Sequence, residues 1–267
     1  DGVVHGLDFL RNVNLGRKVK IGKTVVVIGG GNTAIDAART ALRKGAKKVT
    51  IIYRRTIEDM PADPREIRDA LEEGIEIMSL VAPIRFVGAD RVNGIECVKM
   101  ELDGFDSSGR RKPVVKEGSL FTIKTDMVIP AVSQTSDLPF IKKDEVEITE
   151  WGTFVTDPDT LMTTMEGVFA GGDVVRGSDV AITAIADGKK AAASIDLYLG
   201  GKGILNKGEP IEIPPALDQD EIMEHERFPM EILPPEKRKD CFREVVQGYH
   251  KLNAIAESMR CLRCDRR

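Results

Sequence analysis

The chain has 267 residues, which is enough for one large domain or two modest domains, each with a hydrophobic core. Hydrophobic residues make up 42% and charged residues 31% of the chain, as in ordinary soluble globular proteins. A net charge of −4 gives no reason to expect a nucleic-acid or membrane partner, and no apolar run is long enough to cross a bilayer. Four cysteines without a dense framework favour a reducing compartment, so we expect a cytoplasmic protein.

The first part of the chain alternates between strand and helix patterns. A short helix over residues 7–14 and a basic connector are predicted first. Strands are then predicted over residues 24–28, 49–53 and 75–80, and helices over residues 32–44 and 64–73. Gly45 is a natural stop for the first of these helices. This βαβαβ order predicts an α/β fold of the Rossmann-like class, with helices packed on a parallel sheet.

The next part has a different pattern. Strands are predicted over residues 84–87, 91–101, 120–125 and 127–132. The polar turn "DGFDSSGRRK" separates two of them, so we expect a β-meander laid on the α/β core, with "MVIPAV" as a further buried strand. The segment "GVFAGGD" at residues 167–173 repeats the pattern of a strand followed by glycines, and a helix is predicted over about residues 179–199.

The last part is rich in proline, which predicts an extended C-terminal tail. A terminal helix is predicted over about residues 243–259, directly before "RCLRCDRR".

The first glycine-rich loop, "GGGNTA", fits the pattern G-x-G-x-x-A between a strand and a helix. Gly29 permits a tight turn, Gly31 permits close approach of a pyrophosphate, and Ala34 permits close packing of the helix on the strand. Asn32 and Thr33 place free N–H groups at the helix start, facing the anion. The loop therefore predicts a dinucleotide site, and the alternative is a structural turn without a ligand.

The end of the second strand indicates which dinucleotide binds. The strand ends in Tyr53, Arg54 and Arg55, and no acidic residue follows until Glu58. NAD sites place an acid there for the ribose 2′-hydroxyl, whereas arginines suit a 2′-phosphate. The sequence therefore favours NADPH, and the alternative is a solvated pair of arginines.

These motifs resemble those of the glutamate synthase small-subunit family, a group of NADPH-dependent FAD oxidoreductases. The resemblance runs through "GLDFLRNVN", "VVVIGGGNTAIDAARTALRKGAKKVTIIYRR", "EDMPA", "EEGIEI", "SSGRRKPV" and "GVFAGGDVVRGSDVAITAIADGKKAAASI". It implies a flavoprotein with two dinucleotide-binding domains, the NADPH domain being inserted into the FAD domain. It also implies that Arg54 and Arg55 contact the 2′-phosphate.

The resemblance assigns the second glycine motif to FAD. It implies that Asp173, after Gly172, accepts a hydrogen bond from a ribityl hydroxyl. It also implies that Val180, Ala181 and Thr183, at the start of the next helix, approach the flavin ring and phosphates. The alternative from the residues alone is a tight structural turn.

The same resemblance divides the chain into four parts. Residues 1–23 would be a connector from the flavin domain, and residues 24–126 the NADPH-binding domain. Residues 127–204 would be the C-terminal part of the FAD-binding domain, and residues 205–267 the tail. The family's first FAD-binding loop is absent from residues 1–23, so we expect a longer polypeptide. We expect this chain alone to bind NADPH but to hold FAD weakly or not at all.

Cys261 and Cys264 form a C-x-x-C pair near the end of the chain. Such a pair can ligate an iron–sulfur cluster or zinc, or act as a redox dithiol. Only two ligands are visible, so further ligands would come from missing residues or a partner chain. The alternative is a pair of free thiols. Cys97, in a strand pattern, is expected to be a small buried residue.

No Ser–His–Asp or paired-carboxylate pattern is present, so no catalytic residue is assigned. This suits a flavoprotein, in which the cofactors carry the hydride. We expect an enzyme that passes electrons from NADPH through FAD to an iron–sulfur domain or another redox subunit. The alternative is a nucleotide-binding scaffold within a larger redox complex that does not itself catalyse hydride transfer.

Overall fold

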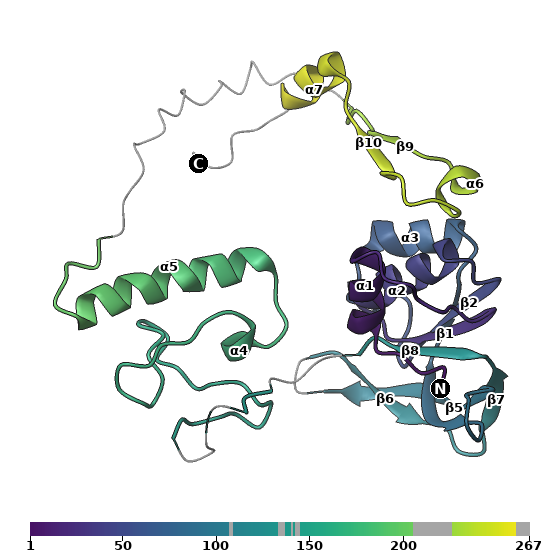
Figure 1. The fold of residues 1–267 in the computed structure, drawn as a ribbon, viewed down its shortest axis with the longest axis horizontal. Coiled ribbons are helices and arrows are strands. Elements are labelled where there is room, and N and C mark those ends of the chain that lie inside the picture. The colour runs from purple at the N-terminus through teal and green to yellow at the C-terminus, as the bar shows by residue number, and fades with distance from the viewer. Residues whose placement is uncertain (107–108, 133–136, 140, 142–144, 205–225, 260–267) are drawn as a thin grey trace. The chain divides into compact units, whose positions relative to one another are not determined.

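The computed structural model describes residues 1–106, 109–132, 137–139, 141, 145–204 and 226–259 (Figure 1). The chain divides into two compact units. The first unit joins Asp1–Val132 to Ala216–Arg267, and the second is Ser133–Pro215. Cys261 and Cys264, and residues 205–225 of the predicted extended tail, lie outside the described residues.

The first unit begins with alternating helices and strands. They are α1 (Gly6–Asn14), β1 (Thr24–Ile28), α2 (Asn32–Arg43), β2 (Lys48–Tyr53), α3 (Pro64–Glu72) and β3 (Glu76–Ser79). These elements confirm the predicted βαβαβ order. Gly45 follows the end of α2 with a φ of +103°, a conformation that favours glycine.

A four-stranded parallel sheet has the order β3-β2-β1-β8, in which β8 is Met127–Pro130. Val25 of β1 is in register with Val49 of β2 and Met127 of β8. The predicted domain boundary before Met127 therefore differs from the division in the structure. The strand after that boundary pairs with β1, and the compact unit ends at Val132.

Both faces of this sheet are covered. Val25 and Val27 lie in a buried cluster with residues of α1, α2 and α3. Val26 and Ile52 point to the other face and pack with residues of an antiparallel sheet. Because successive side chains of a strand point to opposite faces, the apolar run of β1 supplies both clusters.

The antiparallel sheet is the predicted meander, with one added strand. It consists of β4 (Val81–Val87), β5 (Gly94–Phe105), β6 (Arg111–Val115) and β7 (Phe121–Lys124). Both β6 and β7 pair with β5. The sequence interpretation assigned Arg111 to a polar turn, but Arg111 begins β6 and its backbone pairs with Phe105.

The described C-terminal part of the first unit, residues 226–259, forms a hairpin and two short helices. They are β9 (Glu231–Ile232), α6 (Pro235–Arg238), β10 (Val246–Gly248) and α7 (Lys251–Ser258). The prediction of one helix over about residues 243–259 is therefore wrong in its first half. Val246 pairs with Ile232, and Gly248 has a φ of +79°, so the chain turns before α7 begins.

A buried ionic cluster holds this C-terminal part against α2 and α3. The Glu73 side chain is 0% exposed and lies 2.7 Å from Arg39 and 2.8 Å from Arg43. Arg238 of α6 is 2% exposed and contacts Asp69 at 3.2 Å. Its Nε lies 3.1 Å from Glu73, an ion pair without a hydrogen bond at that nitrogen. Charges buried in this way are found in pairs or networks, because an unpaired buried charge is costly.

The described residues of the second unit contain little regular structure besides α4 (Asp173–Arg176) and α5 (Ala181–Tyr198). The strand expected before the second glycine motif is present among the described residues only as an isolated bridge between Met162 and Phe169. The Phe169 and Tyr198 rings meet edge to face, with centroids 6.0 Å apart. None of the described helices is long and apolar enough to span a membrane.

Candidate functional site

The first glycine loop lies at the carboxyl end of β1, where ligands of open α/β sheets bind. Gly29 has a φ of +146°, and a side-chain carbon there would collide with the Ala131 carbonyl oxygen. A side-chain carbon at Gly30 would lie 2.5 Å from the Tyr53 ring. At Gly31 such a carbon would meet nothing within 4 Å, so this side of the loop is open. The loop is thus closed toward the protein and open where a pyrophosphate would approach.

The start of α2 offers unpaired donors to this open side. Ala34 and Ile35 donate to the Gly31 carbonyl. Within the described part of the chain, the backbone N–H groups of Gly31, Asn32 and Thr33 have no acceptor. Free N–H groups and the helix dipole together favour an anion at this position.

A second segment supports the loop. The Asn32 side-chain oxygen accepts a hydrogen bond from the Asp63 N–H at 2.9 Å, and the Ala62 N–H donates to Gly30 at 3.2 Å. The Tyr53 hydroxyl donates to the Asp59 carbonyl at 3.0 Å. Residues 59–63, which include most of the "EDMPA" segment, therefore support the glycine loop through these hydrogen bonds. The Asn32 side chain is used within the protein, which leaves its backbone N–H for a ligand.

The two predicted phosphate-binding arginines have different environments. Arg54 is exposed, and its side chain has no partner among the described residues. Arg55 is 3% exposed; it donates to Asp106 at 2.6 Å and to the Arg111 carbonyl at 2.8 Å. Arg55 therefore links the end of β2 to the β5–β6 hairpin, whereas Arg54 is open to solvent.

The second glycine motif forms a tight turn in the second unit. Gly172 has a φ of +71° and a ψ of −150°, a conformation that L side chains rarely adopt. Asp173 follows as the first residue of α4 and is exposed. Its carboxylate has no hydrogen-bond partner among the described residues. Such a carboxylate is available to accept a hydrogen bond from a ligand hydroxyl.

The start of α5 also offers free donors. Val180 precedes the helix without a side-chain cap, and Thr183 folds back to donate to the Val180 carbonyl at 2.6 Å. In the described residues, the backbone N–H groups of Ala181 and Ile182 have no acceptor. This arrangement fits a ligand with an electron-rich group.

Sequence reasoning missed the residues that hold this turn. Asp187 of α5 accepts a hydrogen bond from the Gly172 N–H at 2.9 Å and pairs with Arg176 at 2.7 Å. The sequence feature that could have pointed to Asp187 is its place in an alanine-rich helix, directly before Gly188.

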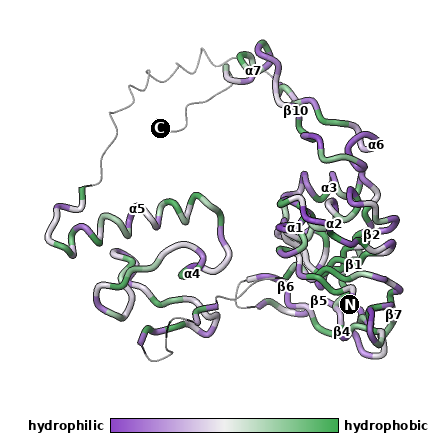
Figure 2. Tube along the Cα trace, in the orientation of Figure 1, coloured by the Kyte–Doolittle hydropathy of each residue, from purple (hydrophilic) through white to green (hydrophobic). Residues whose placement is uncertain are grey.

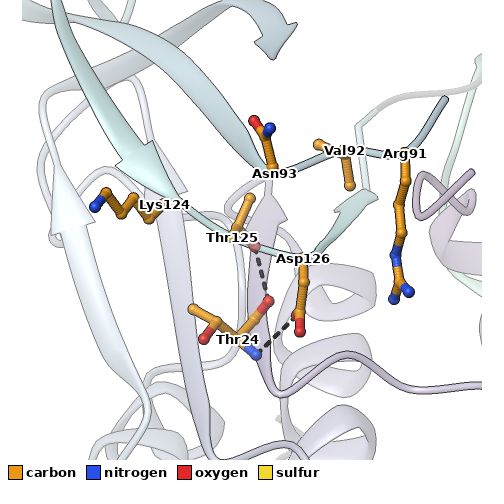
Figure 3. Close-up of a pocket in the computed structure, with 7 residues that line it drawn as sticks. All are labelled: Thr24, Arg91, Val92, Asn93, Lys124, Thr125 and Asp126. Atoms are coloured by element: carbon orange, nitrogen blue, oxygen red, sulfur yellow. Dashed lines mark hydrogen bonds between the residues drawn. The ribbon is translucent and has the colours of Figure 1, made fainter. Parts of the chain in front are cut away.

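A cavity of about 580 Å³ lies elsewhere in the described chain (Figure 3). It is lined by Thr24, Arg91, Val92, Asn93, Lys124, Thr125 and Asp126. Thr24 is the first residue of β1, so this cavity is at the opposite end of the sheet from the glycine loop. The Asp126 carboxylate accepts hydrogen bonds from the Thr24 and Lys23 N–H groups, and Arg91 and Lys124 point in different directions. We therefore place no nucleotide there.

No cluster of three or more potential metal ligands is present among the described residues. The Cys241 thiol donates to the Lys237 carbonyl at 3.0 Å. Cys97 is 0% exposed, as predicted, and burial raises the pKa of its thiol to about 11. Ligation by Cys261 and Cys264 stays a prediction.

The geometry defines a Rossmann-type nucleotide loop and a second glycine turn suited to a ligand hydroxyl. Residues 1–188 match the family described as pyridine nucleotide-disulphide oxidoreductase, and the chain belongs to that family. This membership confirms the predicted Rossmann-like fold and the predicted class, an oxidoreductase.

Comparison with curated proteins finds three informative relatives. The chain is 40% identical to the NADP(+)-dependent formate dehydrogenase subunit beta of Moorella thermoacetica, over 99% of this chain and 39% of that protein. It is 38% identical to the NADPH-Fe(3+) oxidoreductase subunit beta of Geobacter sulfurreducens, over 98% of this chain and 44% of that protein. It is 42% identical to the glutamate synthase [NADPH] small chain of Azospirillum brasilense, over 75% of this chain and 44% of that protein.

These relatives confirm the resemblance to the glutamate synthase small-subunit family. The chain spans less than half the length of each of them.

Solved structures agree on the fold. Thioredoxin reductase of T. acidophilum matches with a TM-score of 0.54 and 26% identity, over 74% of this chain and 57% of that one. FprA of Mycobacterium tuberculosis in complex with NADPH matches with a TM-score of 0.58 and 16% identity, over 74% of this chain and 58% of that one. The second likeness shows the fold alone.

Proposed function

We propose that this chain carries the NADPH-binding part, and one part of the FAD-binding site, of an NADPH-dependent flavin oxidoreductase. Electrons would pass from NADPH through FAD to an iron–sulfur domain or another redox subunit. The observation that carries this proposal is the open glycine loop at the carboxyl end of β1, with the exposed Arg54 at the end of the neighbouring strand.

The nucleotide proposal rests on donors that the protein does not use. Gly31, Asn32 and Thr33 offer free N–H groups to a pyrophosphate, next to the closely packed Gly29 and Ala34. At the end of β2, a 2′-phosphate would find the Arg54 guanidinium and no acidic side chain before Glu58. We assign the 2′-phosphate contact to Arg54, because Arg55 uses its Nε and Nη2 atoms within the protein.

The flavin proposal rests on Asp173 and the start of α5. The exposed carboxylate after the Gly172 turn suits a ribityl hydroxyl, and the free N–H groups at Ala181 and Ile182 suit an electron-rich part of the cofactor. Val180 and Thr183 shape this helix start. When bound, FAD would supply the chemistry of hydride acceptance and onward electron transfer. The chain's own residues would bind and orient it.

The redox partner is proposed from the names of two relatives and from the terminal cysteines. Both relatives are named subunit beta, one of a formate dehydrogenase and one of an Fe(3+) oxidoreductase. Cys261 and Cys264 have the spacing of cluster ligands, with the remaining ligands supplied from elsewhere. We also propose a cytoplasmic location, which the sparse cysteines support.

Replacing Arg54 tests the nucleotide assignment. Arg54→Gln is expected to weaken NADPH binding on the order of tenfold and to change NADH binding little, because only NADPH carries the 2′-phosphate. The measurement is a calorimetric titration of each nucleotide into the purified protein.

Two matched controls make this result specific. Arg11→Gln changes another exposed arginine, on α1, and should leave both affinities unchanged. Arg55→Gln should lower stability without changing the ratio of NADPH to NADH affinity, because Arg55 is buried against Asp106. Equal losses of NADPH and NADH in Arg54→Gln would contradict the 2′-phosphate assignment.

A visible spectrum separates the enzyme from the alternative of a nucleotide-binding scaffold. Oxidised-flavin bands in the complete polypeptide, bleached by NADPH, support the enzyme. A colourless complete polypeptide that still binds NADPH supports the scaffold.

A further inference from the structure

An unusual aspartate lies on α5. Asp187 is 2% exposed and is the only buried residue of this 18-residue helix, although its apolar neighbours Ile182 and Ile185 are 68% and 53% exposed. Aspartate is almost never fully buried unless it is paired. The burial of this side chain therefore calls for partners strong enough to offset its desolvation.

Among the described residues, the hydrogen-bond partners of Asp187 come from one short segment, residues 172–176. The Gly172 N–H donates to Oδ2 at 2.9 Å. Arg176 donates from Nε to Oδ2 at 2.7 Å and from Nη2 to Oδ1 at 2.7 Å, which is a bidentate pair. Hydrogen bonds from Arg176, and then from Gly172, lower the pKa of the Asp187 carboxyl to about 2. The carboxylate is therefore charged throughout the working range of pH.

These contacts enclose the residue assigned to the flavin. Gly172 immediately precedes Asp173, and Arg176 ends the same helical turn. A side-chain carbon at Gly171 would lie 2.8 Å from the Asp187 Cβ, so the turn is packed directly onto this position of α5. Asp187 thus holds both ends of α4, while Asp173 itself is exposed and has no partner in the part of the chain that the structure describes.

We propose that Asp187, through Gly172 and Arg176, is a positioning residue that orients the Asp173 carboxylate toward the flavin ribityl chain. This inference rests on the proposed function, in which Asp173 accepts a ribityl hydroxyl. Asp187 does not touch the cofactor in this proposal. It reduces the freedom of the turn before the cofactor binds, and such preorganisation increases affinity.

The test measures flavin retention in the complete polypeptide purified with its flavin. Asp187→Asn has nearly the same shape but loses the charge that binds Arg176, and should weaken flavin binding on the order of tenfold. NADPH affinity should not change. The matched control is Asp196→Asn on the same helix, whose carboxylate accepts a hydrogen bond from Gly203 at 2.8 Å; it should retain flavin as the wild type does.

A double-mutant cycle separates positioning from general support of the fold. If Asp187 acts through Asp173, adding Asp187→Asn to Asp173→Asn should cost little further flavin affinity. Additive losses would overturn the proposal, as would wild-type flavin affinity in folded Asp187→Asn. If Asp187→Asn does not fold, the flavin affinity of Arg176→Glu tests the proposal instead. The Arg176 side chain is 46% exposed, so the protein should tolerate this change, and reversing its charge removes the ion pair with Asp187. Undiminished flavin affinity in Arg176→Glu would also overturn the proposal.

The flavin content of the wild-type polypeptide separates a failure of the proposed function from a failure of the positioning role. A wild-type polypeptide that binds no flavin contradicts the proposed function. A flavin-containing wild type with equally flavin-rich Asp187 and Arg176 variants contradicts only the positioning role.

Discussion

Two alanine-rich helices, α2 and α5, each follow a glycine turn but differ in what they bury. α2 buries five residues, all apolar: Ala34, Ile35, Ala37, Ala38 and Ala41. α5 is longer, at 18 residues, and buries only Asp187. Figure 2 shows hydrophobic residues recurring along the whole of α5.

The difference lies in the hydrophobic pattern of each helix. The apolar residues of α2 form one stripe, which packs on the parallel sheet of the first unit. Those of α5 are spread around the helix, which is typical of a helix covered on several sides.

Each unit also contains a buried carboxylate, and their partners differ. Glu73 is surrounded by Arg39 and Arg43 of α2 and by Arg238 of α6, two segments of the first unit that lie far apart in the sequence. Asp187 is paired with one arginine and one backbone amide from a single turn. The first carboxylate joins distant parts of the chain, whereas the second fixes a local geometry.

The largest expected effect is at Glu73. Glu73→Gln would leave buried arginines without their shared anion, and breaking a buried pair in this way costs about 3–5 kcal/mol. Glu76→Gln is the matched control, because its pair with Lys48 is 55% exposed on both sides and such surface pairs contribute about 0–1 kcal/mol. Urea denaturation measures both variants. Equal effects of the two changes would show that the Glu73 cluster does not hold the C-terminal segment.

Truncating one isoleucine in each helix tests the contrast between them. Ile35→Ala removes a fully buried side chain of α2 and should cost about 2–5 kcal/mol. Ile185→Ala removes a side chain that is 53% exposed and should change the free energy of unfolding by less than about 0.5 kcal/mol in this chain. The urea midpoint measures the first unit, and near-ultraviolet circular dichroism with limited proteolysis follows the second. A loss of stability for Ile185→Ala comparable to that for Ile35→Ala would show that this side chain of α5 is buried in the chain.

The same contrast explains how much of the molecule could be predicted from sequence. The parallel sheet, α2 and the glycine loop were predictable because local signals agree there: an apolar strand, glycines at a turn and an amphipathic helix. β6 was hidden within a polar turn, and β10 within an apparent helix. Both strands depend on pairing with distant residues.

At the candidate site, too, contacts between residues distant in the sequence could not be predicted. The sequence identified Arg54 and Arg55 as a pair, but it could not show that Arg55 is buried, because its partner Asp106 is 51 residues away. Asp187 was missed because an aspartate within a helix is ordinarily a solvated residue. Its role depends on a turn 15 residues earlier in the chain.

The smallest predicted effect is a pH dependence of the difference in stability between the wild type and Glu73→Gln. Burial alone would raise the pKa of the Glu73 carboxyl, but hydrogen bonds from Arg39 and Arg43 outweigh burial and lower it below its usual range. A carboxyl with a lowered pKa in the folded state contributes stability fully above its unfolded pKa of about 4.3, and loses that contribution as the pH falls through the folded value. The stability advantage of the wild type over Glu73→Gln should therefore be constant from about pH 7 to about pH 5 and shrink progressively toward about pH 3. Urea midpoints of both proteins at matched ionic strength measure this difference, and an advantage that persists or grows on acidification would mean that Glu73 does not hold its charge through the arginine cluster.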